Sequence, residues 1–182
     1  MKRFGKIVIK NLVDLFELLI IGTVVFALTY IFAGQLLRVT GDSMLPNFHD
    51  GEQIIAEKVT VKIENLKRDD IVIFEHPINP DRLVIKRVIG LPGETIELEN
   101  GKVFIDGKML NEPYLTTETK TLTGNYIKDN VAYKIPADSY IFLGDNRTNS
   151  TDSRDWGPIN KSLVVGKAFL VYYPFNELGL VK

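Results

Sequence analysis

The sequence predicts a mainly β fold, in which one N-terminal transmembrane helix precedes an antiparallel β-rich domain. Two observations carry this prediction. Residues 18–37 contain no charged side chain, and a helix of that length spans about 30 Å, the hydrocarbon thickness of a bilayer. The rest of the chain consists of short runs rich in valine, isoleucine and threonine, bounded by glycine, proline, asparagine and aspartate. That pattern is typical of strands and turns.

The flanks of the apolar segment predict its orientation. Four basic residues precede it: Lys2, Arg3, Lys6 and Lys10. Because basic flanks favour the cytoplasmic side, we expect a single-pass protein of the cell membrane. Residues 1–17 would be cytoplasmic, residues 18–37 the anchor and residues 38–182 an exported domain. A cleavable signal peptide usually has a shorter apolar core, and a buried core helix is rarely so uniformly apolar.

Seven segments after the anchor have the composition of strands. They are residues 52–59, 70–76, 82–90, 94–100, 102–107, 139–145 and 164–174. Asn-Gly at 100–101 and Asp-Gly at 106–107 favour tight hairpin turns. The polar stretch 105–135 predicts a small hairpin or loop insertion. No long helical pattern follows residue 37, so we expect one antiparallel domain.

The composition limits the chemistry available to this domain. The formal net charge is −1, so nothing in it indicates a nucleic-acid partner. The chain has no cysteine, which excludes thiol nucleophiles, disulfides and thiolate metal sites. Only two histidines, His49 and His76, are present. We expect neither a metal nor a cofactor.

Ser43 is the first candidate for chemistry. Five residues separate it from Leu37, a reach of at most about 20 Å, so it would lie near the outer membrane surface. A serine needs a base to act as a nucleophile. His49 or His76 would make a Ser-His-Asp triad, which the sequence supplies poorly. The alternative base is a neutral lysine.

Lys86, in the strand 82–90, is the candidate lysine. Side chains alternate between the two faces of a strand, so we expect one of Lys86 and Arg87 to reach solvent and the other to be enclosed. Burial lowers the pKa of lysine, and a drop of about 2–3 units from about 10.4 would make a useful base. Arginine stays protonated. The alternative is an ordinary strand lysine that reaches solvent.

A third block, residues 143–159, is dense in polar side chains. It could form a hydrogen-bonded platform that orients a neighbour, or it could be a solvated turn with its own caps. The three blocks read GDSMLPN, VIKRVIGLPGE and GDNRTNSTDSRDWG, in this order behind the anchor. Together they resemble the bacterial type I signal peptidases, in the form with a single anchor, from the anchor to about Tyr173.

This resemblance implies a signal-peptidase-like catalytic domain, and a membrane-anchored serine endopeptidase that removes N-terminal signal peptides through an acyl-enzyme. Cleavage would follow small residues, at sites of the Ala-x-Ala type. The implied partners are exported preproteins and the lipid bilayer. Ser43 matches the nucleophile of the family, Lys86 its general base and Ser150 the serine that orients the lysine.

Three further residues match polar positions that support the site: Asp145, Asp152 and Arg154. The backbone N–H of Ser43 would serve in the oxyanion hole. Some members also donate a serine hydroxyl from two residues before the nucleophile, where this chain has Gly41. The sequence therefore leaves open how the hole is completed.

Two other functions compete with this interpretation. Another Ser–Lys peptidase, such as a self-cleaving repressor, would carry a DNA-binding helical domain in place of the anchor. A catalytically silent module of the same fold would capture exported peptides by strand addition. The intact serine, lysine and polar block argue against the silent module.

Overall fold

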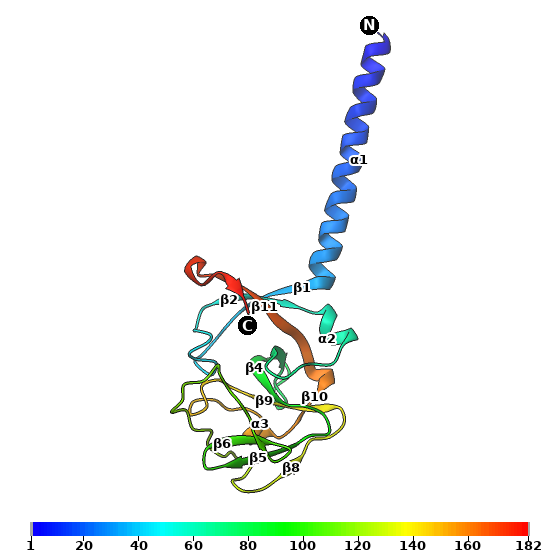
Figure 1. The fold of residues 1–182 in the computed structure, drawn as a ribbon. Coiled ribbons are helices and arrows are strands. Elements are labelled where there is room, and N and C mark those ends of the chain that lie inside the picture. Colours follow the sequence, from blue (N-terminus) through cyan, green and yellow to red (C-terminus); the bar gives the residue numbers. More distant parts are fainter. Residues whose placement is uncertain (1, 182) are drawn as a thin grey trace.

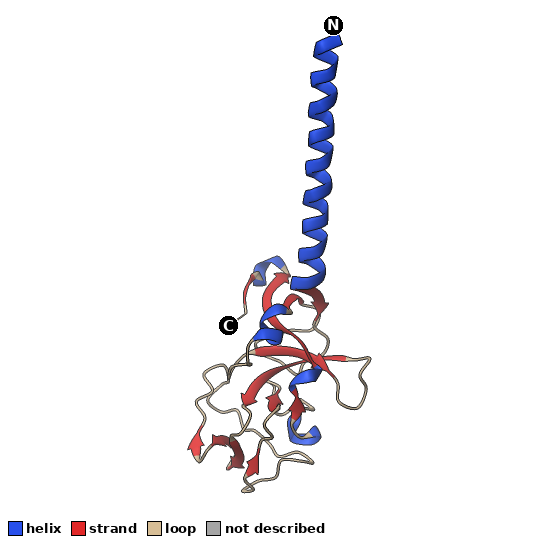
Figure 2. Cartoon of the chain, turned by 90° about the vertical axis from the view of Figure 1, so that its right-hand side faces the viewer, coloured by secondary structure: helices blue, strands red, loops and turns tan. Residues whose placement is uncertain are grey.

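The computed structural model describes residues 2–181 and, within the N-terminal helix, the side chains of residues 10–26. Helix α1 (Lys2–Ala33) extends away from a β domain, as two views at right angles show (Figures 1 and 2). The side chains of residues 10–26 are exposed. Over the described residues, no helix combines the length and the apolar character needed to cross a membrane.

The helix ends four residues before the apolar run does. We expected residues 34–37 to belong to the anchor, but they lie in strand β1 (Gly34–Arg38), which pairs with strand β2 (Gln53–Glu57). Backbone pairing with β2 replaces helical hydrogen bonds for these residues. The chain therefore joins the sheet directly at the end of α1.

The larger sheet has eight strands in the order β1-β2-β11-β3-β4-β9-β10, and β12 pairs with β11 beside this path. Its remaining strands are β3 (Ile71–Glu75), β4 (Leu83–Gly90), β9 (Ser139–Leu143), β10 (Ile159–Asn160), β11 (Val164–Tyr173) and β12 (Gly179–Leu180). Each of these strand pairs is antiparallel.

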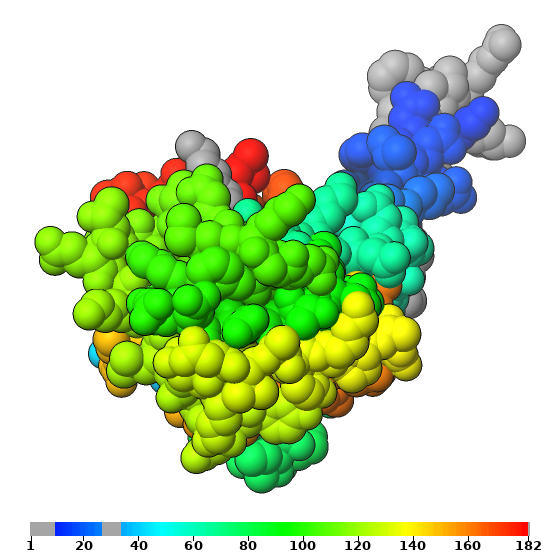
Figure 3. Space-filling model, turned by 60° about the horizontal axis from the view of Figure 1, so that its bottom comes forward, coloured from blue at the N-terminus to red at the C-terminus, as the bar shows by residue number. Residues whose placement is uncertain are grey.

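A smaller sheet has the order β7-β6-β5-β8. Its strands are β5 (Thr95–Glu99), β6 (Lys102–Ile105), β7 (Lys108–Met109) and β8 (Tyr133–Lys134). Asn100 and Gly101, and then Asp106 and Gly107, have positive φ angles, which confirms the two predicted tight turns. This sheet lies at the end of the domain farthest from α1 (Figure 1), and that end is turned toward the viewer in Figure 3.

The other helices are short. They are α2 (Val59–Ile63), α3 (Ser153–Trp156) and two 3₁₀ turns, η1 (Lys161–Leu163) and η2 (Phe175–Glu177). The mainly β prediction is therefore confirmed, and all seven expected strands are present. The two-residue strands β7, β8, β10 and β12 were not expected, because two residues are too few to show an alternating pattern.

Strand β3 shows how the core is built around the site. Its residues Ile71 and Ile73 pack into one apolar cluster, while Val72 and Phe74 pack into another on the opposite face. All four are 0–2% exposed, which explains why this strand is a continuous apolar run. Its neighbour β4 pairs Lys86 with Val72. A lysine on β4 is thus placed against a strand whose first four residues are buried.

Candidate active site

Residues 41–48, which we call the serine turn, hold Ser43 between two buried anchors. Met44 is 0% and Phe48 3% exposed, and both pack in one apolar cluster with Ile54. The backbone N–H groups of Asn47 and Phe48 both donate to the carbonyl of Met44 at 3.0 Å. Ser43 itself lines a cleft of about 620 Å³. Apolar packing on one side therefore presents the hydroxyl on the other.

Lys86 and Ser43 contact each other directly. Lys86 Nζ donates to Ser43 Oγ at 2.7 Å and to the carbonyl of Ile85 at 2.9 Å. Lys86 is only 3% exposed. Burial lowers the pKa of its amine to about 8, against the opposing charges of Asp152 and Asp145. A lysine with this pKa is neutral in about a tenth of the molecules at pH 7 and in about half at pH 8, and its lone pair can then accept the Ser43 proton.

Arg87 does not reach solvent, which corrects our expectation that one of the two basic neighbours would do so. It is 2% exposed. Its guanidinium binds both carboxylate oxygens of Asp145, at 2.8 and 2.6 Å, and lies 4.0 Å from the ring centroid of Tyr114. The alternation of side chains was correct, but the second face is covered as well. A bidentate carboxylate is what allows an arginine to be buried there.

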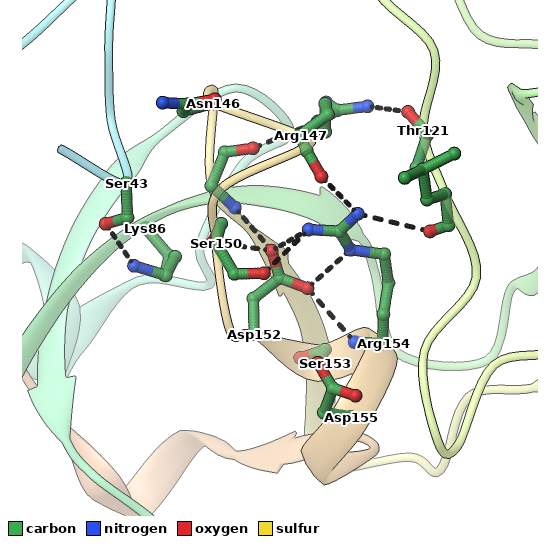
Figure 4. A network of polar contacts seen from close by, with 12 residues as sticks. Ser43, Lys86, Thr121, Asn146, Arg147, Ser150, Asp152, Ser153, Arg154 and Asp155 are labelled. Carbon is green, nitrogen blue, oxygen red and sulfur yellow. Dashed lines mark hydrogen bonds and ion pairs between the residues drawn. The ribbon is translucent and has the colours of Figure 1, made fainter.

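Asp152 is the centre of the polar block (Figure 4). Its carboxylate is 0% exposed. It accepts hydrogen bonds from Ser150 Oγ at 2.8 Å, from Gly144 N at 3.0 Å and from three nitrogens of Arg154 at 2.8–3.1 Å. It is also the N-cap of α3. The block is therefore a connected platform and not a solvated turn.

This platform reaches the serine turn through Asp145 and the residue that follows it. Asn47 Nδ2 donates to Asp145 at 2.8 Å. The backbone N–H of Asn146 donates to the carbonyl of Ser43 at 3.0 Å. Sequence reasoning did not single out Asn47 or Arg87 as parts of the site. Arg87 had a signal, since an arginine next to apolar strand residues requires a buried carboxylate.

Of the sequence-predicted residues, Ser43 and Lys86 come together, as do Ser150, Asp152 and Arg154. Ser150 and Lys86 are not joined by a hydrogen bond in the part of the chain that the structure describes. Ser150 donates instead to Asp152. Gly144 lies between Ser150 and the serine turn, where there is no room for a side chain. A Cβ at this position would lie 2.2 Å from Ser150 Oγ and 2.5 Å from the Ser43 carbonyl oxygen. Only glycine permits this approach.

Neither histidine binds Ser43 in the described residues. His49 is exposed and contacts Glu52. His76 lines the cleft and stacks edge-on against Trp156, but its Nδ1 accepts the backbone N–H groups of Ile78 and Asn79 at 3.1 and 3.2 Å. Across the same residues, no cluster of three or more side chains could hold a metal ion.

Strand β4 gives the cleft an open strand edge. Residues 83–86 of β4 line it, opposite residues 37–43. On one side β4 pairs with β3 from Leu83 to Arg87, but β9 on the other side pairs only with residues 87–90. The first half of β4 therefore has a free edge beside Ser43 and Lys86. An extended peptide can add to such an edge through main-chain hydrogen bonds.

A family model and individual relatives of this chain carry the same description. The family model described as signal peptidase, peptidase S26, matches residues 12–173. Signal peptidase I S of Bacillus subtilis is 35% identical and covers 93% of each chain. Signal peptidase I T of the same organism is 40% identical over 79% of this chain and 76% of its own length. A signal peptidase I structure from Enterococcus faecalis matches at 31% identity, covering 57% of this chain and 97% of its own, with a TM-score of 0.46.

Proposed function

This chain belongs to the signal peptidase family, peptidase S26, and on that premise we propose that it is a serine endopeptidase that removes signal peptides from exported preproteins. The observation that carries the proposal is the 2.7 Å contact between Ser43 Oγ and the amine of buried Lys86. A pKa near 8 suits that amine to act as a general base.

Acylation begins with neutral Lys86. Its Nζ takes the proton of Ser43 as Oγ attacks the scissile carbonyl, and the carbonyl oxygen becomes an oxyanion. When the tetrahedral intermediate collapses, the C–N bond breaks and the Lys86 ammonium gives its proton to the leaving amine. The signal peptide is then an ester of Ser43. Lys86 next deprotonates a water molecule, which attacks the ester, and the proton returns to Ser43.

The substrate would lie as an extra strand on the free edge of β4 at residues 83–86. This pairing would place the scissile carbonyl beside Ser43 Oγ and the backbone N–H groups of the serine turn. Small side chains at the first and third positions before the cut, as the resemblance implies, would face the cleft wall. Alternation along a strand places those two residues on one face.

Asp145, Asp152 and Arg154 would support the site without contacting the substrate. Asp145 holds the serine turn through Asn47, and Asp152 holds Gly144 and Ser150. The proton of Ser150 is donated to Asp152. Its oxygen lone pairs are thus what it can offer to Lys86, as an acceptor for the ammonium form.

Ser150→Ala should lower kcat by about 10- to 1,000-fold, the cost of a supporting hydrogen bond worth roughly 1.5–4 kcal/mol in the transition state. Ser153→Ala is the matched control, because Ser153 is buried and accepts the backbone N–H of Phe142 at 3.0 Å. It should lower the melting temperature with little change in kcat. Equal losses of kcat in the two variants would assign the role to the wrong serine.

We propose that α1 is the membrane anchor, with the N-terminus in the cytoplasm and the β domain outside. The exposed apolar side chains of residues 12–26 support this, as do the basic residues before them. The anchor would hold the enzyme and its membrane-borne substrate in one plane. A protease added outside intact cells should digest the region after Ala33 and spare the extreme N-terminus. Full protection of the β domain would contradict this orientation.

The function itself is tested with the purified full chain in detergent. A preprotein with an Ala-x-Ala site should yield a mature product whose mass places the cut directly after the second alanine. A matched preprotein with the last alanine replaced by a bulky residue should remain intact. Binding of both preproteins without any cleavage would indicate a silent binding module instead.

A further inference from the structure

The backbone N–H of Ser43 is the donor that an oxyanion would use. Among the described residues no acceptor binds it, whereas the N–H of Gly41 donates to Asp50 at 2.8 Å and the N–H of Leu45 to the carbonyl of Asp42 at 3.2 Å. Gly41 has no side chain to add a second donor. The stabilisation of the oxyanion in this chain therefore depends on how well the Ser43 N–H is aimed.

Asn146 donates hydrogen bonds to the peptide groups on both sides of Ser43. Its side-chain Nδ2 donates to the carbonyl oxygen of Asp42 at 3.0 Å. Its backbone N–H donates to the carbonyl oxygen of Ser43, also at 3.0 Å. One residue from the other side of the site thus fixes the peptide before Ser43 and the peptide after it.

The first of these bonds controls the direction of the Ser43 N–H. A peptide group is planar, and in the trans form its C=O and N–H point in opposite directions. The Asp42 carbonyl and the Ser43 N–H belong to the same peptide group. A donor that holds the carbonyl on one side therefore holds the N–H on the other, and it also polarises the group so that the N–H becomes a better donor.

We propose that Asn146 is a positioning residue that aims the Ser43 N–H at the oxyanion, an inference that rests on the proposed function. Its own side chain is oriented for this task, because Thr148 Oγ1 donates to Asn146 Oδ1 at 3.3 Å, which directs the Nδ2 group to Asp42. The preceding residue, Asp145, is fixed by the two bonds from Arg87. The amide therefore comes from a rigid support.

The test compares two peptides that differ only at the reacting carbon. A peptide aldehyde with an Ala-x-Ala sequence forms a tetrahedral adduct: Ser43 Oγ bonds to the aldehyde carbon, the serine proton passes to Lys86, and the aldehyde oxygen becomes an oxyanion. The corresponding peptide alcohol binds the same cleft and cannot form this adduct. The change in this affinity ratio between a variant and the wild type reports the effect of the substitution on the adduct and its oxyanion, apart from its effect on binding of the peptide.

Asn146→Ala should lower kcat for the preprotein about 10- to 100-fold with a small change in KM, somewhat less than the roughly 10²–10³-fold cost of removing a donor outright. It should weaken the aldehyde by a similar factor and leave the alcohol unchanged. Asn146→Asp keeps the size but places an acceptor against the Asp42 carbonyl, so it should be at least as impaired. In Asn146→Ala, the acidic limb of the pH profile of kcat/KM should not move, since Asn146 does not touch Lys86.

Asn160→Ala is the matched variant for a purely structural effect. Asn160 caps the 3₁₀ turn η1, where its side-chain oxygen accepts the backbone N–H of Ser162 at 2.9 Å, and it does not line the cleft. It should lower the melting temperature and leave the aldehyde-to-alcohol ratio as in the wild type.

An unchanged ratio in Asn146→Ala, or equal weakening of both peptides, would overturn the role of Asn146 while wild-type cleavage kept the proposed function intact. A wild-type protein that neither cleaves the preprotein nor binds the aldehyde would reject the proposed function, and this inference with it.

Discussion

Lys86→Arg should have no measurable turnover at any pH at which the protein stays folded. Arginine keeps the positive charge and the approximate length, but it does not lose its proton in the working range. If Lys86 contributed only charge or packing, the variant would retain substantial activity. As the base that deprotonates Ser43, lysine cannot be replaced in this way. Cleavage of the preprotein, followed by product mass, measures the outcome.

Two variants make this experiment interpretable. Lys86→Met has similar length and no charge, and it should be as inactive as Ser43→Ala while still binding the uncleavable peptide alcohol. His49→Ala changes an exposed residue whose ring contacts Glu52, and it should keep most activity. Turnover by Lys86→Arg, in a preparation free of host peptidase, would falsify the mechanism.

The same lysine sets the pH dependence of the wild type. The neutral amine is the active form, and its pKa is lowered to about 8 by burial. Since the neutral fraction rises with pH, kcat/KM should rise through about pH 8 and stay high above it. A histidine base would place this acidic limb near 6.5. Values of kcat/KM across the range from mildly acid to alkaline pH separate the two.

The strands could be predicted because their pattern is local. Alternating or continuous apolar runs between glycine and asparagine turns marked the seven expected strands, and the positive φ angles at Asn100 and Gly101 followed from residue type alone. The end of α1 could not be predicted, because Leu36 and Leu37 suit a helix and a strand equally well. Only pairing with β2, distant in the sequence, decides between them.

The contact between Ser43 and Lys86 was suggested by the motif blocks, but the reasons for its geometry lie elsewhere in the chain. The enclosure of Lys86 depends on the packing of β3 and β4. The burial of Arg87 depends on Asp145, 58 residues away. The hydrogen bonds from Asn146 to the carbonyl groups of Asp42 and Ser43 join positions about a hundred residues apart. Such pairings are set by topology, which periodicity in one sequence does not reveal.

Asp152→Ala should be the most destabilising single change in the platform. It removes the acceptor for Ser150 and Gly144, and it leaves Arg154, which is 3% exposed, without its carboxylate. Breaking a buried pair from one side costs about 3–5 kcal/mol, or roughly 6–20 °C in melting temperature for a chain of this size. Lys167→Ala breaks the more exposed pair with Asp70 and should cost about 1 kcal/mol or less. Equal losses of melting temperature in the two variants would mean that the platform around Asp152 contributes no more to stability than an exposed ion pair.

Asp152→Asn separates the electrostatic role of this residue from the structural one. The Asp152 charge raises the pKa of Lys86 and so opposes the effect of burial, while the charge of Arg154 lowers it. With the carboxylate neutralised and Arg154 kept, the pKa of Lys86 should fall further below about 8. The acidic limb of kcat/KM should then move to lower pH, even though the maximal rate falls as Ser150 and Gly144 lose a strong acceptor. A limb that stayed in place, in a variant shown by thermal unfolding to be folded, would mean that Asp152 does not act on the base. A limb that moved to higher pH would contradict the sign of the interaction and place the titrating group elsewhere.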